Sequence, residues 1–427
     1  MRTLRHGQRI FLGVILFAVG LRAFAAPQPP VYEVKLDIPL RGYDGKTSWV
    51  HPRAGLIPGK PGAPLAIVMT LMKARMDRSD VFSPCWDLLT DDLGKTRTTP
   101  QQRTEAFARR PEAEGVEVGA CDFTPQWHQA SGKLLNTGHT VKYKDDTVVP
   151  ERSRQTAYSV YDAEAKSWSA WKTIDMPDEP RFYNCGAGCT QRVDLEDGSI
   201  LLPIYFRNRE SKDYRSAVMK CHFDGTELKF VSIGNELTLL GGRGIYEPSL
   251  TRFRGKFYLT LRNDTSGYVT TSDDGMHFSE PIRWNWDNGT DLGTYNTQQH
   301  WVTHSSGLFL VYTRKGASND HVFRHRAPLF MAAVDTEKLC VIRASERMIL
   351  PENGARYGNF GVVNVSEQET WITEAEWMQV PKIPNSPQRG GSIAMPIDNK
   401  WGTDAKVYVA RIQWKEPNRL FIAPTAK

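Results

Sequence analysis

The stretch EPSLTRFRGKFYLTLR, residues 247–262, has the pattern of a β-hairpin. Apolar and polar side chains alternate along both arms, and Arg254-Gly255 provides a two-residue turn in which glycine tolerates a positive φ angle. Pairing the arms across this turn places Glu247 opposite Arg262 at the open end of the hairpin. Such a pair is either a simple ion pair at a strand tip, which contributes little when exposed, or part of a functional site.

Similar segments recur along the chain, each with two short alternating runs separated by a glycine turn. Examples span residues 193–206, 218–233, 267–281 and 300–314. Helical periodicity is scarce, and its best candidate is segment 100–114. Many hairpins without helices between them predict an all-β fold, and about 400 residues would supply roughly six four-stranded blades of a β-propeller. No linker divides residues 26–427, so we expect one domain there; a pair of β-sandwiches is the structural alternative.

The first 25 residues differ from the rest of the chain. Basic residues surround the apolar run IFLGVILFAVG, and Ala23-Phe24-Ala25 follows it. This pattern is typical of a secretory signal peptide with its cleavage site, and the run is short for a membrane span. We therefore predict a secreted or periplasmic protein that has no membrane partner after cleavage. An uncleaved anchor is the weaker interpretation.

Charge and cysteine content exclude several classes of partner. The formal net charge of +6 falls by four when the signal segment and its four arginines are removed. No basic tract remains to indicate nucleic acid binding. Six cysteines are sparse for a chain of 427 residues, and Cys185 and Cys189 form either a local disulfide or buried thiols. No second close pair or nearby histidine completes a tetrahedral set, so we predict no metal and no cofactor.

Two features around the hairpin resemble the sialidase (neuraminidase) superfamily. The first is an acidic residue before a Ser-Leu strand, followed after the hairpin by Leu-Arg-Asn. The second is TTSDDGMHFSEP, residues 270–281, which is similar to the Asp-box S-x-D-x-G-x-x-W, with Thr271, Asp273, Gly275 and Phe278 at the motif positions. Residues 89–100 are a poorer copy, with Arg97 where an aromatic is expected. The resemblance extends loosely over residues 35–380 and implies a six-bladed β-propeller of sialidase type, in which Asp-boxes are structural turns.

The resemblance also implies a set of site residues, because sialidases carry three arginines, a Tyr–Glu couple and an aspartate. Arg262 and Arg326 match two of the arginines, and Arg53 is the candidate for the first, although WVHPRAG departs from the Arg-Ile-Pro of the family. The remaining assignments are Tyr357 as nucleophile, Glu247 as its base, and Asp77 or Asp80 as the acid. His51 and His325 lie beside proposed arginines and are candidates for substrate contact.

The chemistry needs these residue types. Guanidinium groups hold the carboxylate of an acidic sugar, and a neutral tyrosine avoids the repulsion that a carboxylate nucleophile would meet. The resemblance therefore implies an exo-glycosidase that hydrolyses a terminal acidic sugar, such as a sialoside in an oligosaccharide or glycoconjugate, by a retaining mechanism. Two alternatives stay open: a propeller polysaccharide lyase or other glycosidase that acts on uronate-containing glycans, and a non-catalytic carbohydrate-binding propeller.

Overall fold

The computed structural model describes residues 31–59, 65–380, 395–396 and 402–425, and the predicted signal peptide lies outside them. The described residues form β-strands and four single-turn 3-10 helices, η1 (Ala113–Gly115), η2 (Pro180–Phe182), η3 (Phe323–His325) and η4 (Arg343–Ser345). None of them forms an α-helix, which confirms the predicted all-β class. The helix expected in segment 100–114 is wrong: its prolines interrupt helical hydrogen bonding, and it contains two short strands joined by a turn. No helix in the described part of the chain is long and apolar enough to cross a bilayer.

The strands of the first half of the chain form three antiparallel sheets. The first sheet contains β2 (Thr47–Ile57), β3 (Ala66–Arg75), β4 (Trp86–Thr90) and β5 (Gln101–Gln102). The second contains β6 (Arg110–Pro111), β7 (Val116–His128), β8 (Lys133–Lys144), β9 (Thr147–Val148), β10 (Thr156–Asp162), β11 (Ser167–Trp168) and β12 (Lys172–Thr173). The third contains β13 (Asn184–Gly186), β14 (Val193–Asp194), β15 (Ser199–Arg207), β16 (Arg215–Phe223) and β17 (Leu228–Ile233).

The second half of the chain forms three more such sheets and a small ribbon. The fourth sheet contains β18 (Tyr246–Phe253), β19 (Lys256–Arg262), β20 (Gly267–Ser272) and β21 (Ile282–Arg283). The fifth contains β22 (His300–His304), β23 (Gly307–Tyr312), β24 (Leu329–Asp335), β25 (Cys340–Val341) and β26 (Arg347–Leu350). The sixth contains β27 (Gly361–Asn364), β28 (Glu369–Ala375), β31 (Val407–Trp414) and β1 (Tyr32–Leu40), while β29 (Gln379–Val380) pairs with β30 (Met395–Pro396).

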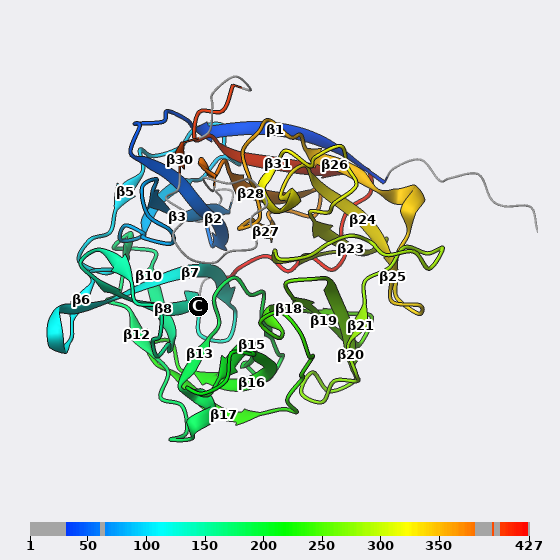
Figure 1. Ribbon diagram of the computed structural model, residues 1–427. Coiled ribbons are helices and arrows are strands. Elements are labelled where there is room, and N and C mark those ends of the chain that lie inside the picture. The colour runs from blue at the N-terminus through cyan, green and yellow to red at the C-terminus, as the bar shows by residue number, and fades with distance from the viewer. Residues whose placement is uncertain (1–30, 60–64, 381–394, 397–401, 426–427) are drawn as a thin grey trace, which may run out of the picture.

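The sheets follow one another in chain order around a common centre, as in a β-propeller (Figure 1). Neighbouring sheets touch through their inner strands: β2 contacts β7, β8 contacts β13, β15 contacts β18, β18 contacts β22, and β22 contacts β27. The ring closes where β27 contacts β2. In the sixth sheet, β1 pairs with β31, so the first and last described strands belong to the same sheet.

Apolar side chains pack between neighbouring sheets rather than at the centre of the ring. One buried cluster joins Val269 of the fourth sheet to Leu310 of the fifth, and another joins Leu329 of the fifth to Ile372 of the sixth. Burying such a side chain fully stabilises the fold by about 2 kcal/mol. Because the apolar cores lie between the sheets, the centre is left to polar and charged side chains.

Both segments that resemble an Asp-box form tight turns. In segment 89–100, Asp92 accepts a hydrogen bond from the backbone N–H of Thr96 at 2.9 Å. In segment 270–281, Asp274 accepts the N–H of Met276 at 2.8 Å, whereas Asp273, the residue aligned with the motif, is 95% exposed. The acid that makes this second turn is therefore one residue later than the motif alignment predicts.

The hairpin at 247–262 has the predicted register near its turn. Residues 249–253 pair with residues 256–260 in that register. Arg254 and Gly255 have φ angles of 49° and 83°, as a type I′ turn requires. The alternation of the sequence therefore sets this part of the hairpin correctly.

A β-bulge changes the register at the open end of the same hairpin. Tyr246, and not Glu247, pairs with Arg262, and Glu247 has a φ angle of 48°. The inner strands β2 and β7 carry register shifts of the same kind, where His51 has φ 56° and Asp122 has φ 57°. A bulge aims one side chain away from the regular alternation, and a left-handed non-glycine residue costs about 1–3 kcal/mol. Three inner strands thus carry strained polar residues.

Two ionisable side chains on strands are almost completely buried. Arg53 of β2 is 1% exposed and donates hydrogen bonds to the Phe123 carbonyl oxygen at 3.2 Å and to Cys189 Sγ at 3.1 Å. Glu374 of β28 is 2% exposed and accepts the N–H of Gly358 at 2.6 Å. Burial raises the pKa of Glu374 to about 7, although backbone N–H groups and nearby arginines act in the opposite direction.

The strain at Glu247 predicts an unusual order of stability for two truncations. Glu247→Ala and Glu247→Gly both remove the carboxylate, but only glycine relieves the left-handed backbone. We expect the Gly variant to have the higher free energy of unfolding, by about 1 kcal/mol, in urea titrations. At Thr251, on the regular part of β18, the order should reverse because glycine weakens a strand. A less stable Gly variant at position 247 would contradict the strain.

The raised pKa of Glu374 predicts a pH dependence of stability. Between the ordinary value of 4.5 and the folded value of about 7, the folded protein holds a proton that the unfolded chain has lost. Stability therefore falls as pH rises through this window, by up to about 3 kcal/mol at 1.4 kcal/mol per pKa unit. Glu374→Gln should flatten this fall in urea titrations from pH 4.5 to 8, whereas Glu367→Gln, at an exposed position, should not. An unchanged slope in Glu374→Gln would rule out this assignment.

Candidate active site

A cavity of about 280 Å³ opens at the centre of the ring, near the lower size limit of about 300 Å³ for ligand pockets. Its lining comes from strands of the first four sheets, from β29 and from loops around the ring: His51, Ser79, Asp80, Phe82, Cys121, Asp122, His139, Val141, Arg152, Arg154, Cys189, Tyr205, Tyr214, Arg243, Tyr246, Glu247, Arg262, Phe323, Arg324, Arg326, Arg356, Asn359, Trp377 and Gln379. The three bulged residues are among them, so the bulges direct polar side chains into this cavity.

Five of the residues proposed from the sequence line this cavity: His51, Asp80, Glu247, Arg262 and Arg326. The tip of the opening hairpin supplies an ion pair, with Arg262 Nη1 2.5 Å from Glu247 Oε2. Arg326 Nε donates to the carbonyl oxygen of Asn296, in the loop before the fifth sheet, at 3.1 Å. The sequence therefore identified a carboxylate and two guanidinium groups that do converge.

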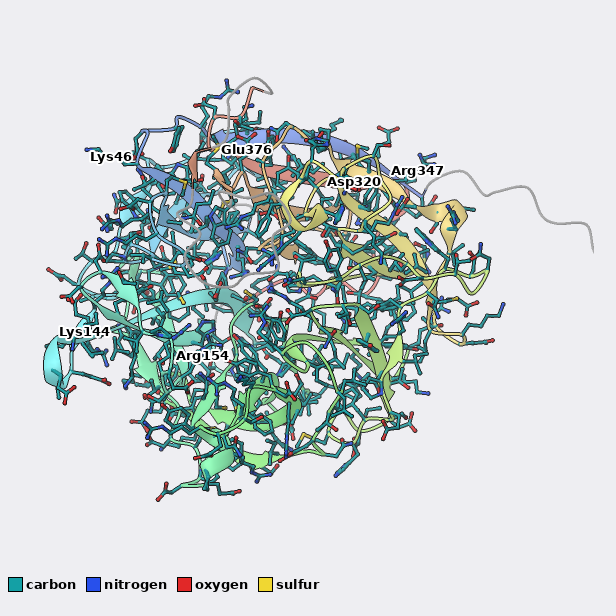
Figure 2. All side chains as sticks on the ribbon, viewed as in Figure 1. Lys46, Lys144, Arg154, Asp320, Arg347 and Glu376 are labelled. Atoms are coloured by element: carbon teal, nitrogen blue, oxygen red, sulfur yellow. The ribbon has the colours of Figure 1, made fainter. Side chains whose placement is uncertain are left out.

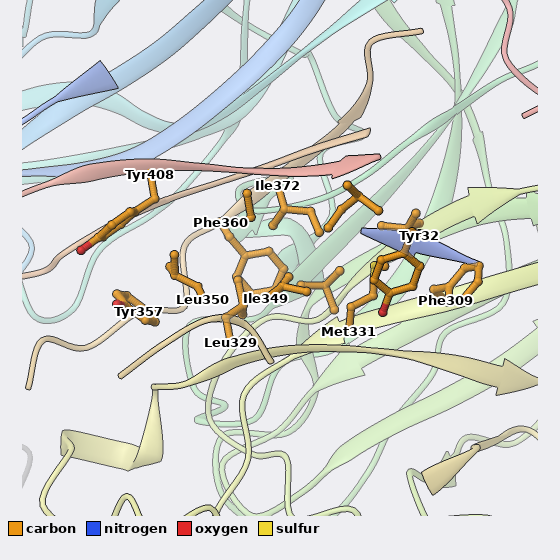
Figure 3. Close-up of a cluster of buried hydrophobic side chains, with 14 of the residues drawn as sticks. Tyr32, Phe309, Leu329, Met331, Ile349, Leu350, Tyr357, Phe360, Ile372 and Tyr408 are labelled. Carbon is orange, nitrogen blue, oxygen red and sulfur yellow. The ribbon is translucent and has the colours of Figure 1, made fainter. Parts of the chain in front are cut away.

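Tyr357, the predicted nucleophile, does not lie in the cavity. Its ring packs in the apolar cluster between the fifth and sixth sheets, close to Leu329, Leu350 and Tyr408 (Figure 3). It is 1% exposed, and its hydroxyl group donates to the carbonyl oxygen of Pro351 at 2.8 Å. Burial also raises the pKa of this phenol well above its ordinary value. The predicted nucleophilic role of Tyr357 is therefore wrong.

Three other predicted residues lie outside the cavity lining. Asp77 is 54% exposed and pairs with Arg75 at 2.6 Å. Arg53 is buried behind the cavity floor, and His51 from the same strand takes the lining position. His325 has its Nδ1 2.5 Å from the hydroxyl oxygen of Tyr295, and its neighbour Arg324 lines the cavity instead. At both positions the residue that lines the cavity is only one or two places along the chain from the predicted one. A bulge or a left-handed residue changes which neighbouring side chain points inward.

Asp122 is the centre of a group of polar side chains on the cavity floor. His51 Nδ1 lies 3.1 Å from its carboxylate, and His139 Nε2 lies 3.4 Å from it. The thiol of Cys189 donates to Asp122 Oδ1 at 3.2 Å. Burial opposes ionisation of Asp122, but the charges of His51, His139 and Arg53 outweigh it and hold its pKa well below the usual range.

The same floor contains atoms that could bind a metal ion. Cys121, Asp122 and His139 place ligand atoms within 4.8 Å of one another. However, the Asp122 carboxylate already has His51 and Arg53 as cationic or hydrogen-bonding neighbours, and burial raises the pKa of the Cys121 thiol well above its ordinary value. A metal would have to displace these contacts and deprotonate the thiol.

Tyr214 is the most unusual phenol in the cavity. Burial raises its pKa, but the positive charges of Arg154, Arg207 and Arg152 outweigh burial and lower the value overall. Its hydroxyl group donates to Asn184 Oδ1 at 3.2 Å. The other two tyrosines of the cavity wall, Tyr205 and Tyr246, have pKa values raised by burial. Tyr214 is therefore the phenol that loses its proton most readily in this wall.

Arginine dominates the charge of the cavity. Seven arginines line it, and two of them have carboxylate partners: Arg262 with Glu247, and Arg243 with Asp264. The other five form no ion pair with any described residue: Arg152, Arg154, Arg324, Arg326 and Arg356. Figure 2 labels Arg154 inside the ring, whereas Lys46 and Lys144 lie at its edge.

Burial affects these unpaired arginines strongly. Desolvation and neighbouring arginines lower the pKa of Arg326 well below its ordinary value and that of Arg356 to about 9. An anion in the cavity would favour the charged form of both groups and relieve their mutual repulsion. The electrostatics of the cavity therefore favour an anionic over a cationic ligand.

Sequence reasoning missed Asp122, Arg154, Tyr214 and Arg356. The segment ERSRQT, residues 151–156, places two arginines just before β10, and this pair is a signal that could have been found. Asp122 interrupts an otherwise regular strand, which is the sequence signature of a bulge. Nothing local to Tyr214 or Arg356 distinguishes them from surface residues.

Comparisons with known proteins reveal similarity in fold. No protein-family model and no curated protein matches this chain. A protein of unknown function from Dyadobacter fermentans superposes with a TM-score of 0.60 at 13% identity, covering 91% of this chain and 100% of that chain. NanB in complex with Optactamide gives 0.54 at 10% identity, covering 90% of this chain and 70% of that chain.

Trypanosoma rangeli sialidase in complex with the inhibitor DANA superposes with a TM-score of 0.53 at 14% identity. The match covers 86% of this chain and 55% of the sialidase, so this chain spans about half of that protein's length. Identities this low show the fold alone. The predicted resemblance is confirmed at that level: this chain has an all-β, propeller-like fold of the sialidase type.

Proposed function

We propose that this chain is an enzyme that cleaves a glycosidic bond in an acidic glycan, by β-elimination next to a uronic acid. The observation that carries the proposal is the setting of Tyr214, which lines the cavity together with Arg152 and Arg154. A tyrosine that attacks a sugar needs an adjacent base, usually a carboxylate. Among the described residues no carboxylate hydrogen-bonds the Tyr214 hydroxyl group, whose partner is Asn184. These surroundings favour a phenol that removes a proton over one that forms a covalent bond.

The proposed step uses side chains that line one wall of the cavity. Arg152 and Arg154 bind the uronate carboxylate and stabilise the negative charge that develops when the adjacent carbon, C5, loses its proton. Tyr214, as the phenolate, accepts that proton. The electron pair forms a C4=C5 double bond while the bond from C4 to the glycosidic oxygen breaks. The leaving oxygen then takes a proton, which Tyr214 can return, so the step balances without a further reactant.

Hydrolysis is the second candidate, and a different set of residues favours it. Asp80, Glu247, Arg262 and Arg326 line the same cavity and correspond to residues that the sialidase resemblance implies. Because Tyr357 is sealed in a core, hydrolysis here would use water directly, with Glu247 as base and Asp80 as acid. An acidic oligosaccharide, including a sialoside, is the substrate class for this candidate.

We also infer the wider setting of the enzyme. Each of the six sheets would be one blade of a single propeller domain, residues 26–427, in which the two segments with Asp-box-like turns join blade strands. Residues 1–25 would be a signal peptide, which would make the mature protein secreted or periplasmic. Both inferences fit an enzyme that meets extracellular polysaccharides.

The first prediction concerns the product. Wild-type protein incubated with a uronate polysaccharide should generate an unsaturated uronide that absorbs in the near ultraviolet. Tyr214→Phe should lower kcat/KM by at least about a hundredfold, because it removes the base, while melting at a similar temperature. Tyr357→Phe, which changes a buried phenol outside the cavity, should keep the activity. New reducing ends without ultraviolet absorbance would favour hydrolysis, and binding without turnover would favour a carbohydrate-binding propeller.

The second prediction concerns the pH dependence of that activity. Because the reactive form is the phenolate, kcat/KM should rise with pH through the pKa of Tyr214. Arg207 helps to lower this pKa, so Arg207→Gln should move the rising limb to higher pH. Arg209→Gln, a nearby change at a residue that stacks on Tyr183, should leave the limb in place. Equal profiles for the two variants would exclude Tyr214 as the titrating base.

A further inference from the structure

The unpaired arginines of the cavity fall into separate groups. Arg152 and Arg154 precede β10 of the second sheet. Burial and the charge of Arg154 lower the pKa of Arg152, and the charges of both arginines lower the pKa of Tyr214. Arg324 belongs to η3, between β23 and β24, and Arg356 lies between β26 and β27. Besides burial, the charge of Arg324 lowers the pKa of Arg356, and the charges of both lower the pKa of Arg326, which directly follows η3. One uronate carboxylate at the first group would leave the charges of the second group unneutralised.

Arg356 is held in a fixed orientation. Its guanidinium lies 4.1 Å from the ring centre of Trp377 and 5.2 Å from that of Phe323. Nη2 donates to Gln379 Oε1 at 3.2 Å. The residue is 9% exposed, yet its buried Nε has no hydrogen-bond partner among the described residues. The two aromatic rings and Gln379 therefore hold a guanidinium group in the cavity wall that has no carboxylate partner among the described residues.

Arg324 lies near the same Phe323 ring as Arg356, and its backbone is strained. Its φ angle is 58°, which is costly for a non-glycine residue, and its guanidinium lies 4.8 Å from the ring centre of Phe323. Within the described ranges no carboxylate lies within ion-pair distance of Arg324 or Arg356. Strain and uncompensated charge at one point of a cavity are both typical of ligand-binding residues.

We propose that Arg324 and Arg356 form a second anion subsite that takes a sulfate ester carried by the same acidic glycan. The proposal rests on the function proposed above, in which the uronate carboxylate binds near Arg152 and Arg154. A sulfate ester offers three oxygens to the N–H donors of these two arginines, whose guanidinium groups both lie near the Phe323 ring, and it stays ionised at any pH at which the protein is folded. The substrate class is therefore a sulfated uronate glycan, with one anionic group for each set of arginines.

The test compares two uronic acid disaccharides of the same sugar sequence, one with a sulfate ester and one without. Isothermal titration calorimetry would measure their dissociation constants with the wild type, Arg324→Gln, Arg356→Gln and Arg154→Gln. We expect the wild type to bind the sulfated disaccharide at least about tenfold more tightly. Arg324→Gln and Arg356→Gln should reduce this ratio to near unity and keep the affinity for the unsulfated sugar. Arg154→Gln should weaken both sugars and keep the ratio.

Several results would overturn the proposal. They are a wild-type ratio near unity, no binding of the sulfated disaccharide, or an equal loss of preference in Arg154→Gln and Arg356→Gln. Because Arg356 is buried, circular dichroism would check its variant, and Arg324→Gln decides the question if that variant does not fold. Inorganic sulfate tests the source of the anion: if it raises the melting temperature of the wild type while the ester confers no preference, the subsite serves a free ion and the proposal is wrong.

The same experiments, together with an assay for unsaturated products, distinguish failure of the subsite from failure of the proposed reaction. If the wild type prefers the sulfated disaccharide but leaves uronate polymers intact, the subsite stands and the elimination reaction fails. If the wild type releases unsaturated products equally from sulfated and desulfated forms of one polymer, the reaction stands and the subsite fails.

Discussion

The site depends on β-bulges in the inner strands of the ring. A regular strand sends alternate side chains into the apolar layers between sheets, and these layers stabilise the fold. At His51, Asp122 and Glu247 the backbone turns left-handed, and the polar side chain points to the centre instead. The fold tolerates this backbone strain because the residues on both sides of each bulge stay paired with the neighbouring strand. The inter-sheet cores thus position a polar site that they do not themselves contain.

This arrangement concentrates positive charge that the described carboxylates neutralise only in part. The cavity wall contains seven arginines, and the ion pairs Arg262–Glu247 and Arg243–Asp264 account for only two of them. Burial makes the charges of Arg324 and Arg326 costly, since desolvation and repulsion from neighbouring arginines both disfavour them. An anionic glycan would stabilise all of them together. The same physics explains why Tyr214, set among guanidinium groups, loses its proton more readily than the other tyrosines in the wall.

The features that could be predicted from the sequence are those that depend on the alternation of apolar and polar residues, on turn residues, or on the family resemblance. The all-β class, the register of the hairpin around Arg254-Gly255, and the convergence of Glu247, Arg262 and Arg326 follow from local pattern or from the family resemblance. The errors occur where one residue changes the direction of a side chain. Alternation cannot reveal whether position 51 or 53 faces the cavity, because a bulge between them reverses the face. Tyr357 fails for a related reason: its spacing suits the site, but its ring fills a gap between two sheets.

The central claim is that these unpaired arginines bind an acidic sugar. The most direct measurement is calorimetric titration of the wild type with a glucuronate-containing oligosaccharide and with its neutral, carboxyl-reduced counterpart, at several salt concentrations. The account predicts that the acidic sugar binds, that its affinity falls as salt increases, and that the neutral sugar binds much more weakly. Equal affinities for the two sugars, unaffected by salt, would contradict it.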